Sequence, residues 1–250
     1  MTWAARKKII YFFVAFGLVA IVALPLVYLF YPRSSCTDGR RNQDEEGVDC
    51  GGSCKKVCEN KPSPLIVNWK RPFKVADGVY SATAYVTNPN FGIAAASVSY
   101  KFKLYDERNI LVGERSGVTT IPPNGDYPVF EGLITVGNRV PAQASFEFTS
   151  LPAWINVIEQ PSLQIKNKNF SDPDSLPRLS VELVNDGVSA ISDISAVVII
   201  YDSDGIAMAA SETFVGTIAG ESSKEILFTW PNPFPRPVGS VDIYPEFLVR

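Results

Sequence analysis

The residues with the clearest capacity for chemistry in this chain are its four cysteines, Cys36, Cys50, Cys54 and Cys58. A segment as short as the one they bound cannot bury a core of its own, so it needs cross-links in order to fold. We predict two disulfides. Four cysteines allow three pairings, and the sequence does not choose among them. The spacing also permits a zinc site with four thiolate ligands, and free thiols are the third alternative.

Oxygen-bearing side chains lie between the first two cysteines. Four of them follow one another at spacings of four, three and four residues: Asp38, Asn42, Glu45 and Asp49. Carboxylate and amide oxygens on a turn-rich loop suit calcium, which makes calcium the candidate cofactor. The alternative is a solvated acidic loop whose charge is balanced by neighbouring arginines and lysines.

The rest of the composition excludes several classes of chemistry. The chain has no histidine, which removes Ser-His-Asp triads, histidine general bases and histidine-ligated metals. Its formal net charge of −3 does not favour a nucleic-acid partner. No paired carboxylates, phosphate-binding glycine loop or reactive-cysteine context stand out. We therefore expect no catalytic residues and no enzyme activity.

The cysteines follow a long apolar segment. Residues 9–31 carry no charge, and as a helix they would span roughly 35 Å, enough to cross a bilayer. Arg6, Lys7 and Lys8 precede them, so the positive-inside rule places residues 1–8 in the cytoplasm. We expect an uncleaved signal anchor, with the remaining chain on the oxidising, extracytoplasmic side. A cleaved signal peptide and a buried soluble helix are the rival interpretations.

The cysteine segment, residues 34–60, resembles a short module common in bacterial and archaeal surface proteins. Its pattern is C-x-D-G-x-x-N-x-x-E-x-G-x-D-C-G-G-x-C-x-x-C, and this chain matches it except that the last gap is one residue longer. The resemblance implies an extracellular setting, often between a membrane anchor and folded domains. It implies no activity.

The remainder of the chain repeats with a period of roughly 97 residues, as residues 64–158 and 161–250. Alternating apolar and polar residues with frequent turn signals predict six or seven short strands in each copy. The predicted fold is therefore all-β, with two tandem immunoglobulin-like antiparallel β-sandwiches. Trp69, Trp154 and Trp230 are interpreted as packing residues. The proline-rich segment from Pro231 to Pro237 is interpreted as a rigid loop, with a polyproline ligand as the alternative.

Phe102, Leu104, Tyr105 and Asp106 match the F-x-L-Y-D signature of the prokaryotic FxLYD domain family, and the chain resembles that family here. The segment 88–90 is similar to the related late-embryogenesis-abundant, WHy-type sandwich domains. The resemblance is weaker in the second copy, which keeps Tyr-Asp at 201–202. It implies small β-sandwiches, usually exported and membrane-tethered, without general catalytic activity. Asp106 is expected to cap the turn of a hairpin.

Together these features predict a single-pass membrane protein with a non-catalytic binding or scaffolding role at the cell surface. Its expected partners are membrane lipid, through one helix, and a protein. The alternative is an accessory subunit of an envelope or secretion membrane complex, in which the helix itself makes the contacts.

Overall fold

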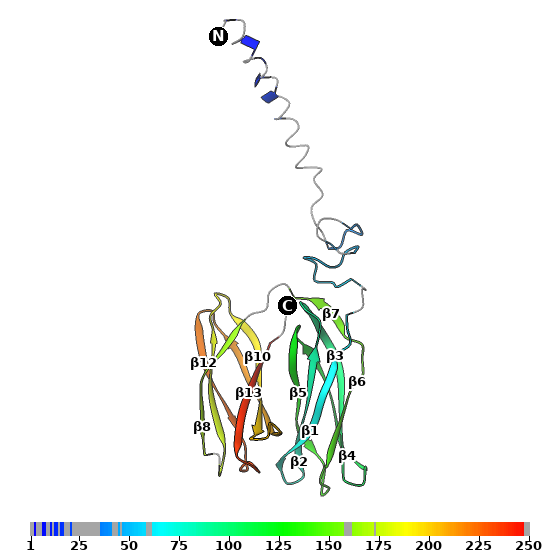
Figure 1. The fold of residues 1–250 in the computed structure, drawn as a ribbon, viewed down its shortest axis with the longest axis vertical. Coiled ribbons are helices and arrows are strands. Elements are labelled where there is room, and N and C mark those ends of the chain that lie inside the picture. The colour runs from blue at the N-terminus through cyan, green and yellow to red at the C-terminus, as the bar shows by residue number, and fades with distance from the viewer. Residues whose placement is uncertain are drawn as a thin grey trace.

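The computed structural model describes residues 36–41, 45, 47–58, 62–157, 162–172 and 174–247, together with scattered positions between 3 and 21. The prediction of an all-β fold is confirmed, since every strand pair among the described residues is antiparallel (Figure 1). The strands are β1 (Ile66–Ala76), β2 (Val79–Asn88), β3 (Ile93–Tyr105), β4 (Leu111–Ile121), β5 (Gly125–Thr135), β6 (Gln143–Phe148), β7 (Ala153–Asn156), β8 (Leu163–Ser171), β9 (Arg178–Asn185), β10 (Ile191–Asp202), β11 (Ala207–Ile218), β12 (Ser222–Thr229) and β13 (Val238–Glu246).

The expected membrane segment, residues 9–31, lies mostly outside the described residues. Its described positions are helical and largely exposed. Within the part of the chain that the structure describes, no helix is long and apolar enough to cross a membrane.

Strands β1–β7 form one layered unit, which we call unit 1. Sheet β1-β2-β5 faces sheet β4-β3-β6, and β7 pairs with the first residues of β3. Side chains alternate across a strand, so every second residue of β2 and β3 enters the space between the sheets. That space is filled by Phe102, Leu104, Val86 and Val98, which are completely buried.

Strands β8–β13 form unit 2 with the same connectivity. Sheet β12-β9-β8 faces sheet β11-β10-β13, and Phe228, Val181 and Leu183 are fully buried between them. Each strand of unit 2 thus has a counterpart in unit 1, in the same chain order. The repeat seen in the sequence is a repeat of strand order.

A buried asparagine makes the same hydrogen bonds in both units. The amide nitrogen of Asn88 donates to the backbone oxygens of Ile93 and Pro122, at 2.8 and 2.9 Å. The amide nitrogen of Asn185 donates to Ser189 and Ala219, at 2.8 and 3.0 Å; both asparagines are almost completely buried. Each tethers two loops at one end of its unit. The repeat therefore extends to individual hydrogen bonds.

The two units pack side by side along a seam. The outer face of β1-β2-β5 meets the outer face of β11-β10-β13, and Phe73, Ile199, Ala207 and Ala210 form a third buried cluster there. The seam explains why β10 contains an unbroken apolar run. Ile200 enters the core of unit 2 and Ile199 enters the seam, so both faces of the strand are covered.

Candidate functional site

The four cysteines form two disulfides, which confirms that prediction. Cys36 pairs with Cys54 and Cys50 pairs with Cys58, at Cα–Cα separations of 5.6 and 4.9 Å. No free cysteine remains. A zinc site with four thiolate ligands needs free cysteine thiolates, and here every cysteine sulfur is in a disulfide. The group formed by Cys36, Glu45 and Cys54 is therefore no thiolate metal site, although its three side chains lie together.

Glycines make this module compact. A Cβ atom on Gly47 would lie 2.7 Å from the sulfur of Cys58 and 2.8 Å from that of Cys50, so no larger residue fits there. Gly51 and Gly52 have φ angles of +78° and +57°, a region that glycine enters without strain. Gly47 thus leaves room for the cysteine sulfurs, and Gly51 and Gly52 allow the turn that follows Cys50.

The acidic residues of the module hold its turns. A carboxylate oxygen of Asp38 accepts a hydrogen bond from the backbone nitrogen of Arg40 at 2.9 Å. Both carboxylate oxygens of Asp49 lie 3.0 Å from the backbone nitrogen of Gly39. Glu45 is buried, with a carboxylate oxygen 3.4 Å from the sulfur of Cys54.

Of the four predicted calcium ligands, Asn42 lies outside the described residues. Among those that are described, Asp38, Glu45 and Asp49 are not gathered into one cluster at ligand distance. The calcium site stays a prediction.

The module is joined to unit 1 through β7. The backbone nitrogen of Asn156 donates to the oxygen of Lys55, and its side-chain nitrogen donates to the oxygen of Cys54, both at 2.6 Å. Lys56 forms a bridge with Ile155. Because Cys54 is itself cross-linked to Cys36, these contacts connect the disulfide framework to the sheet of unit 1.

The F-x-L-Y-D residues have distinct structural roles. Phe102 and Leu104 are core residues, and Tyr105 ends β3 half-buried. A carboxylate oxygen of Asp106 accepts hydrogen bonds from the backbone nitrogens of Arg108 and Ile110, at 3.0 and 2.9 Å. The backbone hydrogen bond from Ile110 is the main cause of a lowered pKa at this carboxyl group. Asp106 is therefore the cap of the β3–β4 hairpin.

An ion pair that sequence reasoning missed completes this hairpin cap. The second carboxylate oxygen of Asp106 lies 2.9 Å from a guanidinium nitrogen of Arg139. In unit 2, Asp202 caps the β10–β11 hairpin in the same way and pairs with Arg236. The signal was present in the sequence, because both arginines follow their aspartates by nearly the same interval.

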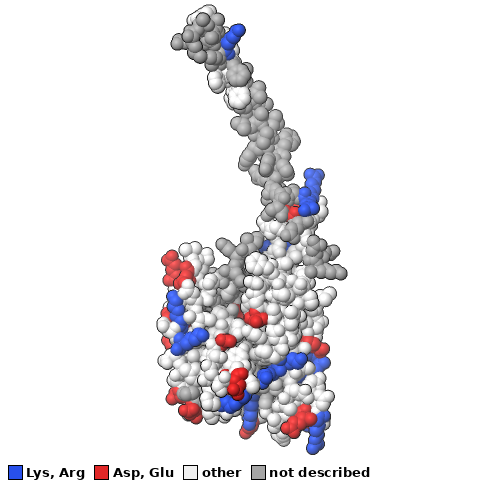
Figure 2. All heavy atoms as spheres, viewed as in Figure 1, with Lys and Arg blue, Asp and Glu red and all other residues white. Residues whose placement is uncertain are grey.

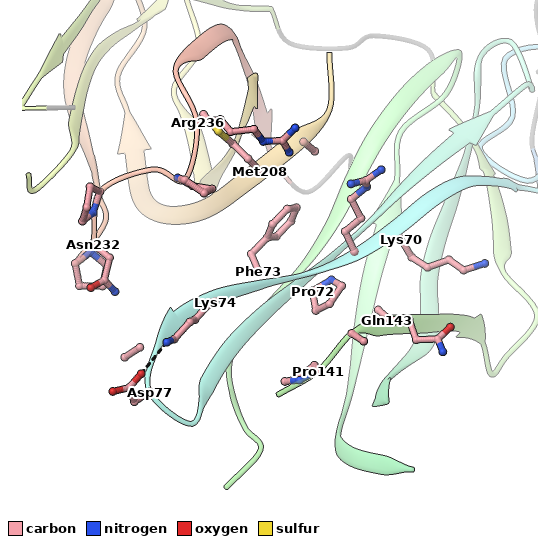
Figure 3. Close-up of a pocket in the computed structure, with 18 residues that line it drawn as sticks. Lys70, Pro72, Phe73, Lys74, Asp77, Pro141, Gln143, Met208, Asn232 and Arg236 are labelled. Carbon is pink, nitrogen blue, oxygen red and sulfur yellow. Dashed lines mark ion pairs between the residues drawn. The ribbon is translucent and has the colours of Figure 1, made fainter. Parts of the chain in front are cut away.

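A large cleft lies at the boundary between the two units, near the β1–β2 hairpin, and has a volume of about 1060 Å³. Unit 1 contributes the segments 70–74, 76–77 and 141–144, and unit 2 contributes 207–208 and most of the loop 231–236. Figure 3 shows Phe73 in the middle, with Met208 and Arg236 on the side of unit 2 and Pro72 on the side of unit 1. The proline-rich loop seen in the sequence is thus one wall of this cleft.

Carboxyl groups meet at another part of the seam. Burial raises the pKa of Glu246 to about 8, and the nearby charge of Glu212 adds to this effect. The pKa of Glu212 is raised as well, by desolvation of its carboxyl group and by the nearby charge of Glu131 of unit 1, although the residue as a whole is exposed on β11. Glu131 in turn accepts a hydrogen bond from the hydroxyl of Tyr100 at 2.9 Å and lies 3.5 Å from the guanidinium of Arg115.

Comparisons with known proteins give no family. No family model matches the chain, and no curated protein matches it. Solved structures with some likeness include a transglutaminase from red sea bream, with 11% identity and a TM-score of 0.24 over 74% of this chain and 31% of that one. A putative β-galactosidase from Bacteroides fragilis has 10% identity and a TM-score of 0.23, over 71% and 34% of the two chains. This chain therefore spans about a third of the length of either enzyme, and neither likeness carries an argument about function.

Proposed function

We propose that this protein is a non-catalytic binding or scaffolding protein, anchored in a membrane and displayed on its extracytoplasmic side. In this proposal residues 9–31 are the anchor, the disulfide module is the stalk, and the two units are immunoglobulin-like sandwiches of FxLYD type. The uncharged length of residues 9–31 supports the anchor.

The observation that carries the proposal is the disulfide module together with its attachment. All four cysteines are cross-linked within a short segment, and such disulfides persist in oxidising compartments. The hydrogen bonds of Asn156 to Cys54 and Lys55 then join the module to unit 1. A stalk joined in this way would hold the two units at a set orientation to the anchor, which suits a protein that presents a surface to a partner.

The side chains also support a non-catalytic role. Several ionisable groups with raised pKa values, such as Glu246 and Tyr201, are half-buried carboxyl and tyrosine groups at the seam. Where a hydroxyl is hydrogen-bonded to a carboxylate, as Ser223 is to Glu182, the pair is exposed on the surface of unit 2 and does not line the cleft between the units. The interactions of the acidic residues, such as Asp106 and Asp202, are those of turn caps and ion pairs.

Protease added to spheroplasts tests this proposal. The full chain should lose its two units while the membrane is intact, and a cytoplasmic marker protein should survive as the control. If the units are cleaved only after the membrane is lysed, they face the cytoplasm and the proposal is wrong.

A further inference from the structure

The cleft between the units carries an excess of positive charge. Its lining includes four cationic side chains and one carboxylate: Lys70, Arg71, Lys74, Arg236 and Asp77. Lys74 pairs with Asp77 at 2.7 Å, and Arg236 pairs with the buried Asp202 behind the lining. Lys70 and Arg71 form no ion pair with any carboxylate among the described residues. Figure 2 shows basic atoms gathered low on the molecule near the boundary between the units, although the whole chain has a net charge of −3.

Most of the other residues of the lining are apolar, and five of them are prolines. Pro72 and Pro141 come from unit 1, and Pro231, Pro233 and Pro235 come from unit 2. Proline fixes its backbone φ angle, so these walls lose little conformational entropy when a ligand binds. Met208 adds an adaptable apolar side chain, and Gln143 offers an amide that can donate and accept hydrogen bonds. The cleft thus combines cations with preformed apolar walls.

This lining disfavours the binding of a ligand as an additional strand beside β1. The strand is the free edge of its sheet, because it pairs only with β2. Pro72 has no backbone N–H to donate, and Lys70 and Lys74 flank it on the same side of the strand. We therefore expect a ligand to be held by side chains.

The lining also argues against sugars and single-stranded nucleic acids. Both are commonly bound by stacking on exposed aromatic rings. The one aromatic residue of the lining is Phe73, which is only 6% exposed because it is the centre of the seam cluster. An acidic peptide is the class of ligand that fits the cleft. Its carboxylates would pair with the cations of the lining, and its apolar side chains would pack against the prolines.

We propose that this cleft binds an extended acidic segment of a protein partner, with carboxylates at Lys70 and Arg71 and apolar side chains against the prolines. The inference deepens the proposed binding function by naming the class of partner. Its walls come from both units, so the site exists only while the seam is closed.

The test is fluorescence anisotropy with the full chain in nanodiscs of zwitterionic lipid. The probe is a fluorescein-labelled peptide of alternating glutamate and leucine, and a lysine–leucine peptide of the same length is its control. We expect saturable binding of the glutamate peptide, weakened about tenfold in the double variant Lys70→Gln/Arg71→Gln. The control variant is Lys166→Gln. Lys166 lies on β8, in the sheet of unit 2 that does not form the seam, so this substitution should leave the affinity unchanged.

Three results with the peptides would overturn the inference, and a fourth concerns other polyanions. The three are equal binding of the two peptides, equal weakening by Lys166→Gln, and no binding at about 1 mM, the weak end of specific affinities. A preference for heparin or single-stranded DNA over the glutamate peptide would assign the cleft to another class of polyanion, and would also contradict it. None of these results bears on the protease experiment, which tests the anchored topology separately.

Discussion

The hydroxyl oxygens of Tyr85 and Tyr244 lie 2.8 Å apart, and each belongs to a different unit. Their rings meet edge to face with centroids 5.9 Å apart, and Tyr85 also stacks on Trp69 at 5.3 Å. Burial raises the pKa of both tyrosines, so both stay neutral and the hydrogen bond persists across the physiological pH range. The seam is therefore held by a directional contact as well as by apolar packing.

Replacing these tyrosines should loosen the seam in a coupled way. Tyr85→Phe and Tyr244→Phe should each cost about 1 kcal/mol, and the double variant little more, because the two substitutions remove the same hydrogen bond. Hydrogen exchange of peptides from β2 and β13 measures this cost in the full chain. Additive costs would mean that the hydroxyls do not interact.

The seam should weaken as the pH rises. The pKa of Glu246 is raised to about 8 in the folded chain from an ordinary value of 4.5, so folding favours its protonated form. The resulting stabilisation is complete below about pH 4.5 and is lost as the pH rises through 8. The charged group that acts on it is Glu212 on its own sheet, which is itself influenced by Glu131 of unit 1, the partner of Arg115.

Hydrogen exchange of β13 peptides, corrected for intrinsic rates, should therefore show less protection at pH 9 than at pH 6. Glu246→Gln, which stays neutral, should remove most of this difference. Asp174→Asn, at an exposed loop position, is the matched control and should change nothing. Equal pH dependence in the Gln variant would show that another group is responsible.

The buried asparagines should be essential for stability, because each donates hydrogen bonds to two loops of its unit. Asn185→Leu keeps the volume but leaves the backbone oxygens of Ser189 and Ala219 without their donor. Each unsatisfied buried group costs about 1–3 kcal/mol, so unit 2 should be strongly destabilised. Asn68→Leu, at an exposed position on β1, should cost less than about 0.5 kcal/mol. Chemical denaturation of the full chain in detergent measures both; similar costs would contradict the assigned role.

The calcium prediction can be tested without disturbing the module. Asp49→Asn keeps an oxygen that can accept the hydrogen bond from Gly39 but removes the charge that a cation needs. We expect calcium at about 1–10 mM to slow hydrogen exchange in residues 34–60 of the full chain, and this effect to disappear in the variant. Identical exchange with and without calcium would leave these acids as turn-forming residues only.

The sequence predicted the elements well because the apolar alternation that marks a strand is local. Ser97 to Leu104 alternates cleanly, and the structure places it in β3. Relationships between units were not predictable in this way. Trp69 was correctly interpreted as a packing residue, yet nothing local says that it packs in the seam, where Tyr85 of β2 and Tyr244 of β13 meet.

The features of the candidate site also divide into local ones that the sequence predicted and long-range ones that it did not. Confinement of the cysteines predicted disulfides, but the pairing depends on how the glycine turns fold back, which pattern alone does not specify. The cleft was missed because Arg71 and Arg236 lie far apart in the sequence and meet only once the two units have packed. Long-range packing of this kind leaves no periodic signal.

The proposed topology requires the chain beyond residue 31 to lie in an oxidising compartment. The direct measurement is acid trapping of intact cells, followed by labelling of the full chain with a maleimide–polyethylene glycol before and after reduction. We predict no gel shift before reduction, and a shift equal to four labels afterwards, from Cys36, Cys50, Cys54 and Cys58. Four labels on the unreduced protein would place the module in a reducing compartment and contradict the account.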